Sequence, residues 1–276
     1  MAKTTKNNVQ KREENFTRRI VTKIWQEQAA PQNPYLAATC RCHGYDLMDL
    51  VNGCSVVEVF FLLFRGELPT KAQADLLEAL MIGLMNPGPR HPATRAAMNA
   101  GVGKTSPAHI LPIGLAVLGG DHLGGEEVMA GMRFFRKNSK SAPADLAAEL
   151  FALPRPAEGD YHIAPGFGSR YGDIDPIPQA MASHLQVMPG SGKALRWGEQ
   201  FAAALKPKGM GWLGSGVAAA TFCDLGFHPR AGAGLFQLLC APGLLAHGLE
   251  MANKPITAMP FLDEEHYVIA PNARSK

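Results

Sequence analysis

The sequence predicts a mainly α-helical fold, and three observations support this prediction. Helix-capping residues precede apolar runs from Ser55 onward, the apolar positions recur with helical spacing, and strand-like patterns occur only near residues 35–46 and 266–269. The chain has 276 residues, of which 46 % are hydrophobic and 18 % are charged. A chain of this length and composition buries a large core, which excludes a disordered protein and a small disulfide-stabilised scaffold.

Two capping boxes mark the first predicted helices. Ser55 and Glu58 stand ahead of the apolar run 59–64, and Thr70 with Gln73 repeats the spacing before a second run. In that second run the apolar residues fall on one helical stripe, formed by Leu76, Leu77, Leu80, Met81, Leu84 and Met85.

Helix signals continue along the rest of the chain. Ser106 followed by Pro107 is typical of a helix N-terminus and opens a run to about Gly119. The further predicted helices are 126–136, 144–153, 193–205, 215–225 and 230–251. The last of these is apolar nearly all round, which predicts a helix at the centre of a core.

A loop rich in proline and glycine, Pro154 to Pro178, interrupts the helices. It holds the most unusual local sequence in the chain, APGFGSRYGDIDP at residues 164–176. Within it we expect Asp175 to cap the turn that follows, as we expect Glu126 and Glu127 to begin a helix elsewhere.

The positive charge of the chain is concentrated at its beginning. Residues 1–24 carry seven Lys or Arg against two Glu, so the rest of the chain sums to −2. We therefore expect a solvated basic arm and no nucleic-acid partner. The five cysteines, an odd number, are interpreted as reduced thiols rather than a disulfide framework.

The sequence predicts a cytoplasmic protein with no membrane partner. The first 30 residues lack the apolar core of a secretory signal peptide. The longest apolar stretch, residues 231–246, is interrupted by Gln237 and Pro242 and is shorter than the roughly 20 residues that a membrane-spanning helix needs.

Several short motifs do not fit the ligand sites that they suggest. Residues 101–105 (GVGKT) and 189–193 (PGSGK) lack the first glycine of a phosphate loop. Residues 214–219 match a dinucleotide fingerprint but follow no strand, and a close helix contact explains their glycines better. The cluster Cys40, Cys42, His43 and Cys54 has none of the usual zinc spacings, so no metal is expected.

Four segments resemble the citrate synthase superfamily, in chain order. APGFGSRYGDIDP resembles that family's PGFGHRVYKxxDPR, and residues 43–70 resemble its region RGYD…EL…GELP. IGLAVLGGDHLGGEEVM, at residues 113–129, is similar to AGLLALGxxHGGANEAV. DLGFHPRAGAGLFQLLCAPGLLAHGLEM, at residues 224–251, is similar to a region of citryl-CoA-lyase-like members.

This resemblance implies an all-α, two-domain homodimer with its active site between the domains. The large helical domain would comprise residues 25–153 and 226–276, and residues 154–225 would form a small helical domain that carries the glycine loop. Members make or break a carbon–carbon bond next to a coenzyme A thioester. They use a His on the enolate oxygen, a glycine-loop His, an Asp base, and arginines that bind carboxylates.

The chain departs from that pattern at four positions. Ser169 replaces the glycine-loop His, Ile177 replaces the Arg after Asp-Pro, Ser215 falls where the family has Asp, and Cys240 falls where it has Arg. Neither serine has a pKa that suits a base acting alone, which argues against ordinary citrate synthesis.

The family's first His maps onto His122 when both flanks are matched, whereas alignment on the following glycines would place Leu123 there. We prefer His122, with Ser169, as the candidate catalytic pair. Enolate stabilisation by His122 and by the backbone N–H groups of Gly166, Phe167 and Gly168 would suit a carbanion made by carbon–carbon cleavage. These three loop residues are the candidate CoA-binding set.

His91, Arg170 and Ser215 are the candidate substrate-binding residues, with the alternative that His91 and Arg170 are only structural or surface groups. No permanently bound cofactor is expected; an acyl-CoA thioester would be the substrate, with a carboxylate as a possible second one. Two functions remain open. One is a CoA-thioester lyase or acyltransferase, and the other is a catalytically inactive CoA-binding or regulatory protein with the same fold.

Overall fold

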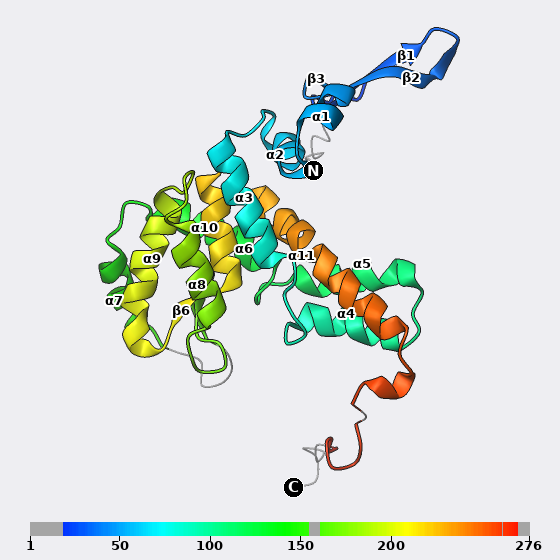
Figure 1. The fold of residues 1–276 in the computed structure, drawn as a ribbon. Coiled ribbons are helices and arrows are strands. Elements are labelled where there is room, and N and C mark those ends of the chain that lie inside the picture. The colour runs from blue at the N-terminus through cyan, green and yellow to red at the C-terminus, as the bar shows by residue number, and fades with distance from the viewer. Residues whose placement is uncertain (1–18, 155–160, 261, 270–276) are drawn as a thin grey trace, which may run out of the picture. The chain divides into compact units, whose positions relative to one another are not determined.

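The computed structural model describes residues 19–154, 161–260 and 262–269. Across this part of the chain there are eleven α-helices and six short strands (Figure 1), so the predicted all-α fold class is confirmed. The chain divides into two compact units at the Ser55–Val56 junction. Most of the predicted basic arm, residues 1–18, lies outside the described residues.

The first unit is built on a β-hairpin. Strand β1 (Trp25–Ala30) pairs antiparallel with β2 (Asn33–Cys42), which pairs with the short β3 (Tyr45–Asp46) before helix α1 (Leu47–Gly53). The predicted strand segment 35–46 is therefore confirmed, whereas β1 was not predicted. Residues 25–55, which we expected inside the large helical domain, belong to this unit.

The second unit begins with six helices. Thr70 caps α3 by the predicted reciprocal box with Gln73. Proline at the first helical position begins α4, α5 and α7, and α4 was missed in the prediction. The bounds are α2 Val56–Arg65, α3 Lys71–Leu84, α4 Pro92–Val102, α5 Pro107–Leu118, α6 Gly125–Asn138 and α7 Pro143–Phe151.

The glycine loop forms a small antiparallel sheet. Strand β5 (Phe167–Gly168) lies in the middle, between β4 (His162–Ala164) and β6 (Gly211–Trp212). The predicted loop ends earlier than expected, because Asp175 accepts the N–H of Ile177 and begins α8 (Pro176–Leu185). The later helices are α9 Lys193–Leu205, α10 Gly214–Asp224 and α11 Pro229–Ala252, followed by an irregular segment. The strand predicted at 266–269 is wrong, because these exposed residues have no strand partner in the described part of the chain.

Helix α11 is central to the second unit and contacts α4, α5 and α6 (Figure 1). Pro242 has no N–H, yet the helix continues through it, and the N–H of Gly243 donates to the Met85 carbonyl at 2.9 Å. By length and mean hydropathy of 1.3 the helix is apolar enough to cross a membrane, but 44 % of its most apolar window is buried inside the protein. A buried core helix meets the same criteria, so this is weak support for a membrane span.

The glycine loop lies directly against the start of α10. A Cβ at Gly166 would lie 2.2 Å from the Gly216 Cα, and a Cβ at Gly216 would lie 2.1 Å from the Gly166 carbonyl oxygen. The same carbonyl accepts the N–H of Leu213 at 3.0 Å. Gly216 therefore serves close backbone packing, whereas a Cβ at Gly214 would meet nothing within 4 Å. The expectation that no strand precedes residues 214–219 was wrong, because the short strand β6 ends at Trp212.

This contact predicts different costs for two alanine substitutions. Gly166 and Gly172 both have positive φ, +83° and +85°, but nothing lies within 4 Å of a Cβ at Gly172. We expect Gly172→Ala to lower the free energy of unfolding by about 1–2 kcal/mol through backbone strain alone. Gly166→Ala adds overlap with the α10 backbone and should cost about 1–3 kcal/mol more. Urea denaturation of both variants measures the difference, and equal costs would show that α10 moves away without resistance.

Candidate functional site

A cavity of about 420 Å³ lies in the second unit. Five segments that lie far apart in the sequence contribute to its lining. They are the segment from Gly83 to His91, Leu123, the segment from Arg170 to Met181, residues 213–215, and Phe236 with Cys240 of α11. A cavity of this volume can hold part of a small-molecule ligand.

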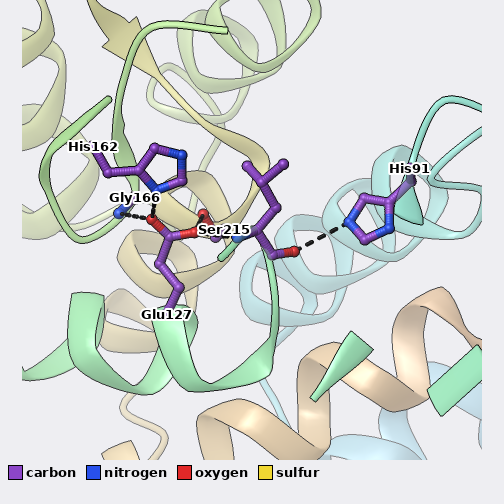
Figure 2. A network of polar contacts seen from close by, with 6 residues as sticks. His91, Glu127, His162, Gly166 and Ser215 are labelled. Atoms are coloured by element: carbon purple, nitrogen blue, oxygen red, sulfur yellow. Dashed lines mark hydrogen bonds and ion pairs between the residues drawn. The ribbon is translucent and has the colours of Figure 1, made fainter. Parts of the chain in front are cut away.

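Glu127 lies beneath this cavity at the centre of a buried hydrogen-bond network (Figure 2). Its side chain is 3 % exposed. One carboxylate oxygen accepts the N–H of Leu123 at 2.8 Å and the hydroxyl of Ser215 at 2.9 Å. The other accepts Nδ1–H of His162 at 2.5 Å and the N–H of Gly166 at 3.0 Å. Four donors from four parts of the chain therefore converge on one side chain.

The donors keep this carboxylate ionised. Burial by itself would raise the pKa of Glu127, but the hydrogen bond and charge of His162, with the Gly166 and Ser215 donors, hold that pKa below its usual value. Since an ionised carboxylate can only accept hydrogen bonds, the Ser215 hydroxyl must donate its hydrogen to Glu127.

His162 connects the network to His122. The two imidazole rings stack with centroids 4.3 Å apart and planes 18° apart. His162 Nε2 is buried and has no hydrogen-bond partner among the described residues. The other ring, that of His122, belongs to an exposed residue.

His91 is held by both of its ring nitrogens. Nδ1 accepts the N–H of Ala93 and caps α4, so the neutral ring carries its proton on Nε2, which donates to the Leu123 carbonyl at 3.2 Å. Burial lowers the pKa of His91, and the nearby Arg170 lowers it further. The ring is thus neutral and has no nitrogen left for a ligand, so of the two interpretations of His91 the geometry supports the structural one.

The cavity wall combines two guanidinium groups with apolar side chains. Arg90 and Arg170 both line it, and the Arg170 guanidinium lies 4.7 Å from the centroid of the Tyr171 ring. Ile177 and Cys240 line it as well, and burial raises the pKa of the Cys240 thiol to about 12. The thiol therefore stays neutral, and the wall offers cations for a carboxylate beside an apolar surface.

The structure brings some of the predicted site residues to this cavity and places others elsewhere. Arg170, Ser215 and His91 line it, and so do Ile177 and Cys240, the two positions at which we predicted that the family has Arg.

The three predicted CoA-binding residues are not among its described lining. The N–H of Gly166 is bound to Glu127, so its predicted role as a donor to a thioester oxygen is not available in this structure. Phe167 and Gly168 lie in the middle strand of the small sheet, and Phe167 is fully buried.

The two candidate catalytic residues also lie outside the described lining of the cavity. The N–H of Ser169 donates to the Tyr161 carbonyl at 3.0 Å. At the ambiguous pair, Leu123 faces the cavity and His122 does not, with Leu123 at a positive φ of 56°. The catalytic roles of His122 and Ser169 stay predictions.

Sequence reasoning missed three features of this site. Glu127 was predicted only to begin a helix, and His162 and Arg90 were not singled out. The signal for Glu127 is weak, because an acidic residue in the first turn of a helix is ordinary. Its importance appears only when residues 35, 39 and 88 positions away donate to it.

Metal ligation gains no support from the described residues. No group of three or more His, Cys, Asp or Glu in this part of the chain could hold a metal ion. All five cysteines are free thiols.

Comparison with known proteins relates this fold to one group of enzymes. No protein-family model matches the sequence, and no curated protein matches it. The structure is similar to that of citryl-CoA lyase from Hydrogenobacter thermophilus, with a TM-score of 0.73 and 26 % identity over 91 % of this chain and 95 % of that chain.

Two larger proteins share the fold at lower identity. ATP citrate lyase from Methanosaeta concilii, in complex with (3S)-citryl-CoA, matches with a TM-score of 0.72 and 18 % identity over 94 % of this chain and 43 % of that one. Our chain thus spans less than half of that enzyme. Citrate synthase from Thermoplasma acidophilum, with carboxymethyl coenzyme A and oxaloacetate, matches with a TM-score of 0.57 and 21 % identity over 80 % and 58 % of the two chains.

The predicted resemblance is therefore confirmed by the three-dimensional fold over more than nine-tenths of the chain. This chain belongs to the citrate synthase-like superfamily.

Proposed function

We propose that the protein cleaves or forms a carbon–carbon bond next to a coenzyme A thioester and holds the acyl part of its substrate in the cavity described above. The observation that carries this proposal is the convergence of Arg90, Arg170 and Ser215 on one cavity in a fold shared with citryl-CoA lyase. Guanidinium groups bind carboxylates with charge-assisted hydrogen bonds.

In the cleavage direction the chemistry needs no external proton. A hydroxyl group β to the thioester loses its proton, the bond between the α- and β-carbons breaks, and its electron pair becomes the thioester enolate. The hydroxyl carbon becomes a carbonyl, and the α-carbon later takes up the proton. The cationic wall near Arg90 and Arg170 would hold the carboxylate of the oxo-acid product.

The proposal predicts cleavage of citryl-CoA or of a related β-hydroxyacyl-CoA in which a methyl group replaces the carboxymethyl group on the β-carbon. The apolar side chains of Ile177 and Cys240 in the wall favour the second kind of substrate. Mass spectrometry of purified protein with citryl-CoA and with citramalyl-CoA should show acetyl-CoA together with an oxo-acid from at least one of them. Absence of acetyl-CoA from both, with the folded protein intact, would contradict the proposal.

Loss of Arg170 should weaken substrate binding. Arg170→Gln removes a charged donor from the cavity while keeping a polar side chain, and we expect KM to rise about 10- to 100-fold. Arg133→Gln is the matched control, because this exposed Arg on α6 contacts Met129 and is outside the described lining of the cavity. Steady-state kinetics measures KM for both variants. Equal KM values would contradict the prediction, because they would show that Arg170 acts only through the net charge of the protein and not by contact with the substrate.

A catalytically inactive CoA-binding protein is the second candidate function. It is favoured by the neutral, doubly bonded His91 and by the position of the candidate catalytic residues His122 and Ser169 outside the described lining of the cavity. A thermal-shift assay with CoA and acetyl-CoA distinguishes the two functions. Stabilisation by CoA without turnover of any thioester would select the binding protein.

We also propose that the protein is a homodimer. Neighbouring helices α5 and α11 expose Ile113, Val117, Leu238 and Leu249, each at least 38 % accessible, and a second copy could cover this apolar surface. Light scattering should give a mass of about twice 29.6 kDa. Leu238→Glu should shift the protein towards monomer, and a monomeric wild-type protein would overturn the proposal.

A further inference from the structure

We propose that Ser215, held in one orientation by Glu127, is the acceptor that recognises the hydroxyl group of the substrate and receives its proton. This inference rests on the proposed function and assigns roles to two residues in it. Ser215 contacts the substrate, whereas Glu127 acts through Ser215 and is a positioning residue.

The first step of the argument is the direction of the Ser215 hydroxyl. Its oxygen lies 2.9 Å from the buried Glu127 carboxylate, which can only accept. The single hydroxyl hydrogen is therefore committed to Glu127, and what remains on Oγ for the cavity is lone pairs. A ligand atom that meets Ser215 must bring its own hydrogen.

The second step is that this orientation is rigid. Ser215 is 2 % exposed and lies in the first turn of α10. Glu127 cannot swing away without breaking its hydrogen bonds to Leu123 N–H, His162 and Gly166 N–H as well. A polar group in such a site discriminates strongly, because a ligand without the matching donor leaves a buried polar atom unpaired.

The third step is the contrast with the arginines of the same cavity. Arg90 and Arg170 can only donate, which suits a carboxylate. Ser215 presents an acceptor, which repels a carboxylate and suits a hydroxyl. The cavity therefore distinguishes the two kinds of oxygen on a hydroxy-acid.

The same arrangement provides a path for the hydroxyl proton in the cleavage reaction. The substrate O–H bond breaks as a bond forms from that hydrogen to Ser215 Oγ, while the original Ser215 hydrogen passes to Glu127. Once the carbon–carbon bond has broken, Glu127 returns the hydrogen to Ser215. Ser215 in turn passes the proton that it took from the substrate hydroxyl to the α-carbon of the enolate. Glu127 ends as it began, ionised and bound to its four donors.

The test compares two ligands that differ only in the hydroxyl group. Calorimetry in the presence of CoA would measure the Kd of citrate and of tricarballylate, which is citrate without its hydroxyl. We expect the wild type to bind citrate about tenfold more tightly. Ser215→Ala should abolish this preference by weakening citrate binding and leave tricarballylate binding unchanged.

Two further variants separate this role from a structural one. Ser183→Ala is the matched control. Ser183 also donates its hydroxyl to a Glu, Glu199, at 3.2 Å, but it lies outside the described lining of the cavity. The Ser183→Ala variant should therefore keep the tenfold preference for citrate. Glu127→Gln can donate an N–H to Ser215, which frees the serine hydrogen and should lose the preference. If thermal melting shows that Glu127→Gln does not fold, Ser215→Ala decides the question.

The outcomes distinguish this inference from the proposed function. Equal affinities for the two ligands in the wild type, no binding of either, or a preference that persists in Ser215→Ala would overturn the inference. Turnover of citryl-CoA without hydroxyl discrimination would leave the proposed function intact. Hydroxyl discrimination without turnover would support the Ser215 assignment as a binding role and contradict the proposed activity.

Discussion

The buried carboxylate of Glu127 is the interaction on which the site depends. An ionised side chain at 3 % exposure is stable only when its oxygens are fully hydrogen-bonded, and here four donors supply this. The donors come from the loop before α6, from β4, from the glycine loop and from α10. Each of these segments is thereby fixed relative to α6, so the position of Ser215 at the cavity follows from an electrostatic requirement in the core.

Backbone packing acts in the same place and on the same segments. Gly166 donates to Glu127 and lies against Gly216, the residue next to Ser215. A side chain at either glycine would push the loop from α10 and lengthen both the Gly166 and the Ser215 hydrogen bonds to Glu127. The glycines of the loop are thus required by close approach between two backbones, and their effect on a ligand is indirect.

Local patterns in the sequence were sufficient for most of the fold but for only part of the site. The Thr70–Gln73 box and the apolar residues of α11 predicted helices that the structure confirms, because capping and burial are local properties. Helix α4 was missed because its buried residues are mostly small, so it lacks the stripe of large apolar side chains that identified α11, and because its cap is the imidazole of His91. The role of Glu127 was missed because its partners are distant in sequence, and the donor role expected of Gly166 failed because that N–H already had a partner.

The hydrogen bonds that a polar residue already makes thus decide what it can offer a ligand. His91 lines the cavity, but both of its nitrogens are used, so it contributes shape and not recognition. Ser215 lines the same cavity, its hydrogen is donated to Glu127, and none of the described residues donates to its oxygen, so it contributes an acceptor. The replacement of a family Asp by Ser215 stays a prediction, and a serine at such a point still has a role to play. Because Glu127 fixes the hydroxyl hydrogen of this serine, the neutral serine oxygen faces the ligand only as an acceptor. It therefore selects for a hydroxyl group, whereas a carboxylate at the same place would select for a cation.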